Sequence, residues 1–154
     1  MYMYCDSACY YDKVSSFEAF GNVKMVQGDT LFLYGDRLYY DGLTQIAEMR
    51  CNVRMENRTT TLLTDSLNYD RVYNLGYFFD GGTLMDEQNV LTSEWGEYSP
   101  QTKQSVFNYN VKLVNPQFTL TSDTLRYNTA SKVADIVGPS DIWSRSEEHT
   151  SELQ

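Results

Sequence analysis

The 154-residue sequence has one histidine (His149), three prolines and three cysteines. It is also poor in basic residues, because twelve Lys and Arg stand against twenty-one Asp and Glu, for a formal net charge of −9. A basic surface is needed to neutralise phosphates along a strand, so this balance argues against nucleic acid as a partner. No apolar run reaches the roughly 18 residues of a membrane span, and no leader-like segment is expected at the N-terminus. The length favours a single domain.

The only histidine lies in a polar segment, residues 145–154, that lacks apolar periodicity. This segment resembles the in-frame translation of a sequencing adapter, and the alternative is a genuine polar tail. We therefore expect a domain over residues 1–143, a non-native tail over 144–154, and a chain that is a fragment. Without this histidine, Ser-His-Asp and Cys-His catalysis and His-ligated metal sites are excluded.

A repeat of 29 or 30 residues runs along the rest of the chain. It is aligned on Tyr10, Tyr40, Tyr69, Tyr98 and Tyr127. A Leu or Met stands seven residues before each Tyr, a small residue five before, and an acid four before. Because five aligned segments share the same residue types at several offsets from the Tyr, we predict a fold built from five units.

Each unit has the two-residue period of half-buried β-strands, and none carries the cap and 3.6-residue stripe of a helix. The thirteen Tyr and seven Phe support the same assignment. Turn-forming residues after each aligned Tyr, such as Asp41-Gly42, predict strand–turn–strand units. The Asn-Val pairs at 22–23, 52–53 and 110–111 are interpreted as the ends of the second strands.

A bend is expected within each first strand. Leu33 has the opposite parity to Leu38 and Tyr40, so a flat strand cannot point all three to one face. The small residue five before the Tyr, Gly35 in the second unit, stands where the strand must bend or bulge. Stacked units of this kind predict a folded, all-β sheet with an apolar inside.

The acid next to this small residue recurs in every unit. We predict that these acids are structural corner residues that accept backbone N–H bonds: Asp36, Asp65, Glu94 and Asp123. A catalytic array and a weak cation site are the alternatives. A catalytic pair would be special to one unit, whereas this acid is present in all, so no catalytic residue is assigned. No metal site and no cofactor are expected.

The three cysteines, Cys5, Cys9 and Cys51, form no C-x-x-C pair. Small buried thiols are the favoured interpretation, and a Cys5–Cys9 disulfide is left open.

Several segments resemble the OstA-like (organic solvent tolerance) family, the superfamily of the periplasmic lipopolysaccharide-transport protein LptA. They lie at residues 6–8, 17–23, 27–31, 33–36, 89–93 and 114–116. The resemblance spans about residues 3 to 142. Two departures are Cys51, where the first unit has Gly21, and Gly81-Gly82 in place of Asn-Val.

This resemblance implies a V-shaped β-jellyroll of stacked antiparallel strands with an apolar groove, located in the periplasm. It implies carriage of the acyl chains of lipopolysaccharide (lipid A) between membranes during outer-membrane assembly, without enzymatic activity. The expected partners are lipopolysaccharide, other lipopolysaccharide-transport proteins bound by edge-strand pairing, and further copies of the chain joined head to tail. Which lipid is carried, and in which direction, stays open.

The residues at the inward offsets are predicted to line this groove and to expose more apolar surface than a monomer usually shows. They are Leu33, Leu62, Leu91, Leu120, Leu38, Leu67, Leu125, Met25, Met55, Leu84, Leu113, Phe78, Phe107 and Ile136. Two other functions remain open: a structural or adhesive β-solenoid with a solid interior, and a polysaccharide-processing enzyme that uses the Asp ladder.

Overall fold

The computed structural model describes residues 2–144, which form thirteen β-strands and one short 3₁₀ helix, η1 (Asp12–Val14). The strands are β1 (Tyr2–Tyr4), β2 (Ser7–Tyr11), β3 (Ser16–Gln27), β4 (Leu31–Asp41), β5 (Ile46–Asn57), β6 (Thr60–Asp70), β7 (Leu75–Phe78), β8 (Gly82–Asp86), β9 (Asn89–Ser93), β10 (Trp95–Tyr98), β11 (Gln104–Val114), β12 (Phe118–Asn128) and β13 (Ala134–Ser144).

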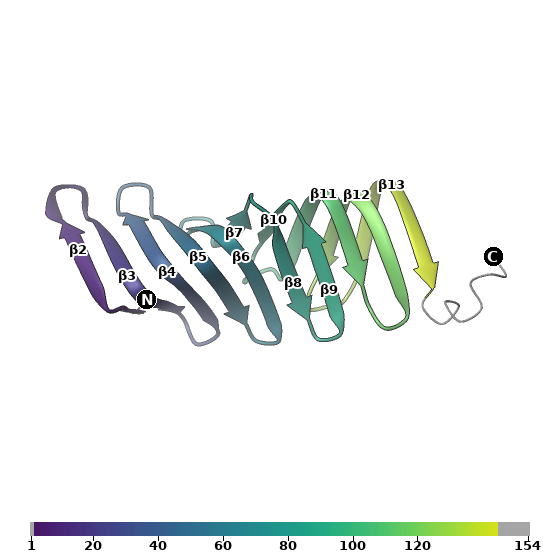
Figure 1. Ribbon diagram of the computed structural model, residues 1–154, viewed down its shortest axis with the longest axis horizontal. Helices are drawn as coiled ribbons and strands as arrows, with labels where there is room; N and C mark the ends of the chain where they lie inside the picture. The colour runs from purple at the N-terminus through teal and green to yellow at the C-terminus, as the bar shows by residue number, and fades with distance from the viewer. Residues whose placement is uncertain (1, 145–154) are drawn as a thin grey trace.

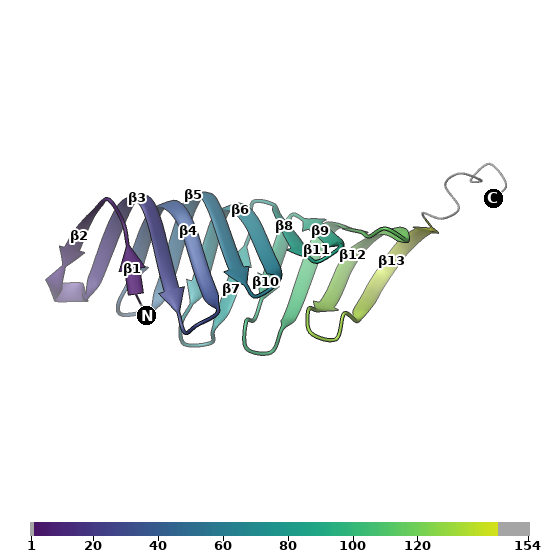
Figure 2. The same cartoon turned by 90° about the horizontal axis from the view of Figure 1, so that it is seen from below.

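All strands belong to one antiparallel sheet in which strands consecutive in sequence are mostly neighbours in space. The strands stack along one long axis from the N-terminal to the C-terminal end (Figures 1 and 2). In the middle of the stack, β7 with β8 and β9 with β10 take the places of two long strands. The predicted all-β class is confirmed.

Each long strand bends near its middle. The pairing of β4 with β5 skips from Tyr34 to Arg37, and the pairing of β12 with β13 skips from Ser122 to Thr124. The skipped segments contain the acid of the repeat, Asp36 or Asp123, and in β4 also the small residue Gly35, as the parity of Leu33 and Leu38 predicts. The predicted bend is therefore confirmed.

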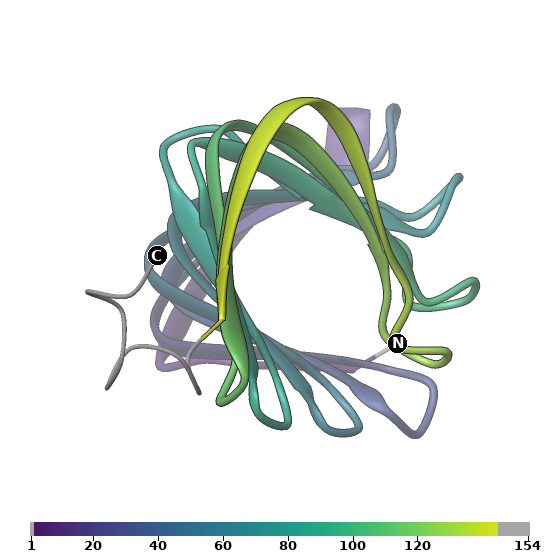
Figure 3. The same cartoon turned by 90° about the vertical axis from the view of Figure 1, so that its right-hand side faces the viewer.

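The bends divide the sheet into two layers. Layer A contains β1, β8, β9 and residues 23–27, 31–35, 53–57, 60–64, 111–114, 118–122 and 140–144. Layer B contains β2, β7, β10 and residues 16–20, 37–41, 46–50, 66–70, 104–108, 124–128 and 134–137. The view along the stack shows the strands curving around its axis, with hairpins projecting at two sides (Figure 3).

The interpretation of the Asn-Val pairs as strand ends is wrong. Asn22, Asn52 and Asn110 lie in the middle of β3, β5 and β11, where these strands cross from layer B to layer A. All three have a positive φ, between 48° and 54°. Asn tolerates this left-handed conformation better than most residues, so the pair marks a bend and not an end.

The expectation of buried thiols is also wrong. The cysteines are free, Cys9 and Cys51 are exposed, and Cys5 is half-buried. Cys9 lies on β2, a strand whose residues are all exposed and whose one partner among the described strands is β3. Cys51 is exposed because it stands at a bend, with φ of 69°.

Candidate functional site

The side chains predicted to line a groove all point between the two layers. Thirteen of the fourteen belong to one core cluster and are at most 3% exposed, and Ile136 is partly buried against that cluster. Phe78 and Phe107 face each other with ring centroids 6.4 Å apart. The structure therefore brings the whole predicted set together, along almost the full length of the stack.

The interior they form is closed by its own side chains. The expectation of an exposed apolar surface is wrong for this structure, because side chains from the two facing layers pack against each other. Burial of each large apolar side chain contributes about 1.5–3 kcal/mol, so this packing is the main stabilisation of the fold. Whether these residues line a lipid groove stays a prediction.

The corner acids lie at the bends where the chain runs from layer A to layer B: Asp36, Asp65 and Asp123 within strands, and Glu94 between β9 and β10. The Nδ2 of Asn52 donates to Asp36 at 2.8 Å, and the Nδ2 of Asn110 donates to Glu94 at 2.5 Å. These partners are side-chain amides, not the backbone N–H groups that we expected. Gly81 and Pro139 stand at the matching positions opposite Asp65 and Asp123. The structural role of the four acids stays a prediction.

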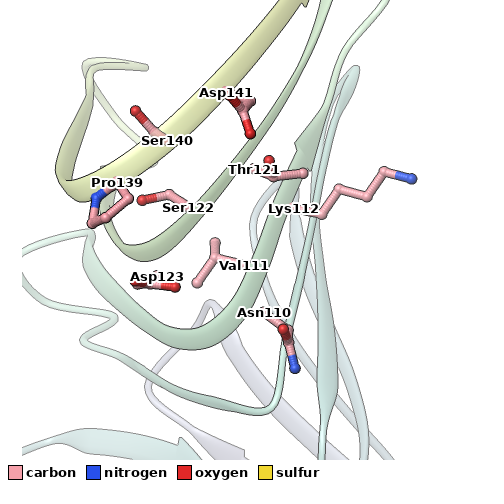
Figure 4. A pocket seen from close by; sticks show the side chains of 9 residues that line it. All are labelled: Asn110, Val111, Lys112, Thr121, Ser122, Asp123, Pro139, Ser140 and Asp141. Carbon is pink, nitrogen blue, oxygen red and sulfur yellow. The ribbon is translucent and has the colours of Figure 1, made fainter.

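Shallow cavities follow the outside of the bends. The cavity at the C-terminal bend has a volume of about 500 Å³ (Figure 4). It is lined by Asn110, Val111, Lys112, Thr121, Ser122, Asp123, Pro139, Ser140 and Asp141. Lys112 extends away from the other labelled side chains, so its charge is not directed at Asp123 or Asp141. A similar cavity lies at the middle bend, around Asp65.

Opposite the bends, the hairpin ends of layer A meet those of layer B along a line that we call the seam. Three positions of the seam carry hydrogen bonds between the layers, and we name them the Gln27, Asn57 and Asp86 sites after the residue from layer A. In the part of the chain that the structure describes, every hydrogen bond across the seam has a side chain as its donor.

The Gln27 and Asn57 sites are neutral amide contacts. The Nε2 of Gln27 donates to Asn74 Oδ1 at 3.0 Å and to the Tyr69 hydroxyl at 3.4 Å. The Nδ2 of Asn57 donates to the Tyr98 hydroxyl at 3.0 Å. Burial raises the pKa of Tyr69 to about 12, so its hydroxyl stays protonated at neutral pH.

The Asp86 site is ionic. Asp86 is fully buried, and its Oδ2 accepts from the Tyr127 hydroxyl at 2.9 Å and from Lys132 Nζ at 2.5 Å. Its Oδ1 accepts from the Thr60 hydroxyl at 3.3 Å. Burial, and then the Asp86 carboxylate, raise the pKa of Tyr127. A buried charge of this kind is tolerated because it is paired and hydrogen-bonded.

Sequence reasoning missed the seam. Its signal is a polar residue seventeen positions after each aligned Tyr, in four units: Gln27, Asn57, Asp86 and Asn115. A period-two strand pattern treats such a residue as an ordinary turn residue. The pairing of Asn57 with Tyr98, 41 residues away, becomes visible only once the layers are placed.

The described residues 2–144 contain no group of three or more His, Cys, Asp or Glu side chains that could hold a metal ion. Within the same residues, no helix has the length and apolar character needed to cross a membrane.

Comparisons with known proteins show what the chain is similar to. The sequence profile of a family described as OstA-like protein matches residues 1–123. Among solved structures, the chain is similar to LptH from Pseudomonas aeruginosa, described as the LptA homologous periplasmic component of the conserved lipopolysaccharide transport device. The identity is 13%, the TM-score is 0.40, and 92% of each chain is covered. No curated protein matches the sequence.

Proposed function

We propose, from the premise that this chain belongs to the OstA-like family, that it is a non-enzymatic carrier of lipopolysaccharide in the periplasm. The acyl chains of lipid A would lie between layers A and B, against the side chains that now fill the interior. The observation that carries this proposal is the continuous apolar lining, from Met25 to Leu125, in a single cluster along the stack. A lining that repeats from unit to unit gives a sliding acyl chain no single deep trap.

Binding requires the layers to separate, since the interior is closed. The bends join the layers covalently, whereas the seam is held by side-chain hydrogen bonds and by packing. A net hydrogen bond contributes about 0.5–1.5 kcal/mol, and each buried acyl CH₂ returns about 0.8 kcal/mol. The seam is therefore the side on which we expect a lipid to enter.

The same proposal includes partners that add to the edges of the sheet. Among the described residues β13 pairs only with β12, and it exposes Ile142 and Trp143, at 60% and 46%. Unpaired strand edges favour strand addition by a second copy or by another transport protein. Replacing Ile142 and Trp143 by Asp should abolish concentration-dependent association in sedimentation experiments. Unchanged association would contradict this part of the proposal.

Lipid A that carries a diazirine on an acyl chain tests the main proposal. After irradiation, labelled residues are located by mass spectrometry. Leu62 and Leu63 are a matched pair on β6, because Leu62 is 1% exposed and Leu63 is 38% exposed. We expect labels on Leu62 and Leu91. Labels confined to Leu63 and other outward residues would contradict the proposal.

The packed interior also supports a second candidate, a structural β-solenoid whose interior takes no ligand. The two candidates predict different labelling and a different effect of the lipid on stability. A structural solenoid gives no labelling of Leu62 or Leu91 at any lipid concentration below aggregation, and it keeps its stability when the lipid is added. A carrier gains stability from a ligand that binds only its folded state.

A further inference from the structure

The Asn57 site contains a small cavity of about 110 Å³ at the seam. Two cationic residues approach it from opposite layers. Arg58 lies in the hairpin between β5 and β6, at the end of layer A, and Lys103 lies in the turn between β10 and β11, at the end of layer B.

These two cations have no acidic partner. Among residues 2–144, the ion pairs are made by Arg50, Arg54 and Lys132, and neither Arg58 nor Lys103 has a carboxylate within 4.0 Å. Lys103 Nζ donates to the Pro100 carbonyl at 2.6 Å. Burial and the Arg58 charge lower the pKa of Lys103. An anion between the two cations would remove this repulsion.

Other polar groups surround the same cavity. Thr59 and Thr129 line it with hydroxyls that make long hydrogen bonds, Thr59 to Asp86 Oδ1 and Thr129 to the Lys103 carbonyl, each at 3.4 Å. A hydroxyl that rotates away from such a long contact can donate to an anion. Asn57 is 2% exposed, and its Oδ1 has no donor among the described residues. A phosphate attached to a sugar matches both kinds of group. The phosphate oxygens accept hydrogen bonds from the cations and hydroxyls, and a sugar hydroxyl donates to Asn57 Oδ1.

The Asp86 site shows what the same positions do when they carry acids. Lys132 stands 29 residues after Lys103, and Asp86 and Glu87 stand 29 residues after Asn57 and Arg58. Lys132 Nζ lies 2.5 Å from the Asp86 carboxylate and 3.8 Å from that of Glu87.

At the Gln27 site the corresponding residues, Gly28 and Asn74, are neutral. The unpaired cations are therefore a property of the Asn57 site and not of the fold.

We propose that the Asn57 site binds the phosphate of an anionic amphiphile at the mouth of the interior, through Arg58 and Lys103. This inference rests on the proposed function, because it places the head group at the seam through which the acyl chains enter. The chemical class is a phosphate monoester on a hydroxylated, sugar-like head group. Charge-assisted hydrogen bonds from both layers to one phosphate would also hold the seam together around its ligand.

NMR titration of the full chain with inorganic phosphate, glucosamine 1-phosphate and phosphorylated lipid A tests the proposal. We expect shifts of the amide signals around residues 57–60 and 103. The variant R58Q/K103Q should bind about tenfold or more weakly, because it loses two charge-assisted contacts. The matched control K13Q/K112Q removes two charges elsewhere and should bind as the unaltered chain does. Equal weakening in both variants, or shifts spread over the surface, would overturn the site.

The probes separate the two possible sources of the phosphate. Tighter binding of phosphorylated lipid A than of inorganic phosphate supports a lipid head group. Equal affinities assign the site to the free ion and overturn the head-group assignment.

Dephosphorylated lipid A separates this inference from the proposed function. Suppose that dephosphorylated lipid A labels Leu62 as strongly as phosphorylated lipid A does, and that R58Q/K103Q changes the labelling by neither lipid. The carrier proposal then stands and the phosphate site fails. If no lipid labels Leu62 while phosphate still shifts residues 57–60, the carrier fails and the anion site stands.

Discussion

The Asn57 and Asp86 sites occupy equivalent positions of the seam but are closed by different chemistry. A neutral amide holds the Asn57 site to the Tyr98 hydroxyl, and the nearby cations are unpaired. A buried carboxylate holds the Asp86 site, where it binds a tyrosine hydroxyl and a lysine together. The backbone arrangement is shared, so the difference comes from the side chains alone.

This difference indicates that the seam is not equally strong along its length. The Asp86 site has three hydrogen bonds across the seam, two of them to a carboxylate, whereas the other two sites have two neutral ones each. Charge-assisted hydrogen bonds are about twice as strong as neutral ones. Separation of the layers should therefore begin at the Gln27 and Asn57 sites and proceed last to the Asp86 site. The layers would then separate easily at the N-terminal and central parts of the seam and less easily at its C-terminal part.

The largest effect is expected from Asp86→Asn. This change leaves Lys132 without its closest carboxylate, and it should lower the free energy of unfolding by about 2–4 kcal/mol. Asn57→Ala should cost about 1–2 kcal/mol, because it removes the neutral hydrogen bond to the Tyr98 hydroxyl and a longer one to the Pro100 carbonyl. Urea denaturation measures both values.

The matched control for the charge change is Asp123→Asn, an exposed acid at a bend, which should change stability by at most about 0.5 kcal/mol. If Asn57→Ala were as costly as Asp86→Asn, the two sites would be equivalent latches and the comparison would fail.

An exchange of charges between the sites should exchange their behaviour toward phosphate. N57D/R58E gives the Asn57 site the acids of the Asp86 site and should weaken phosphate binding about tenfold or more, an effect of about 1.4 kcal/mol. D86N/E87R does the reverse and should create phosphate binding beside Lys132, detected by shifts of its neighbours in an NMR titration. Absence of that gain in a folded D86N/E87R chain would show that geometry, and not charge, separates the sites.

The smallest effect concerns the tyrosine hydroxyls of the seam at alkaline pH. The pKa of Tyr69 is raised to about 12, so the folded state holds this proton more tightly than the unfolded state does. Its contribution is complete below about pH 10 and is lost as the pH rises toward 12, with about 1 kcal/mol gone near pH 11.

Tyr69→Phe should lack this part of the alkaline loss, which is measured as the difference between the two chains in urea titrations at each pH. A variant that loses stability in parallel with the unaltered chain would contradict the role of the Tyr69 hydroxyl. Tyr127, whose pKa is raised by burial and by Asp86, should show the same sign.

The interior and the bends were predictable because they depend on local order in the chain. The opposite parities of Leu33 and Leu38 require a bend between them, and the small residue and acid show where it falls. The recurring apolar offsets likewise identify the core. The closure of that core was not predictable, since it depends on how far apart the two layers lie.

The seam was hidden for a related reason. Gln27 meets Tyr69, 42 residues away, and therefore skips the nearer aligned tyrosine at position 40. No periodicity read along the chain identifies that partner. The free cations of the Asn57 site were equally invisible, because Arg58 and Lys103 come together only through the pairing of separate hairpins.

The central claim is that lipid enters the interior when the seam opens, and a seam that cannot open tests it most directly. Cysteines at positions 27 and 74, in a chain whose native cysteines are replaced by serine, would be bridged by a short bis-maleimide. The same cysteines capped with N-ethylmaleimide are the control. We predict that diazirine lipid A labels Leu62 and Leu91 in the capped chain and that bridging strongly reduces this labelling. Equal labelling of Leu62 in the bridged and capped chains would contradict the claim.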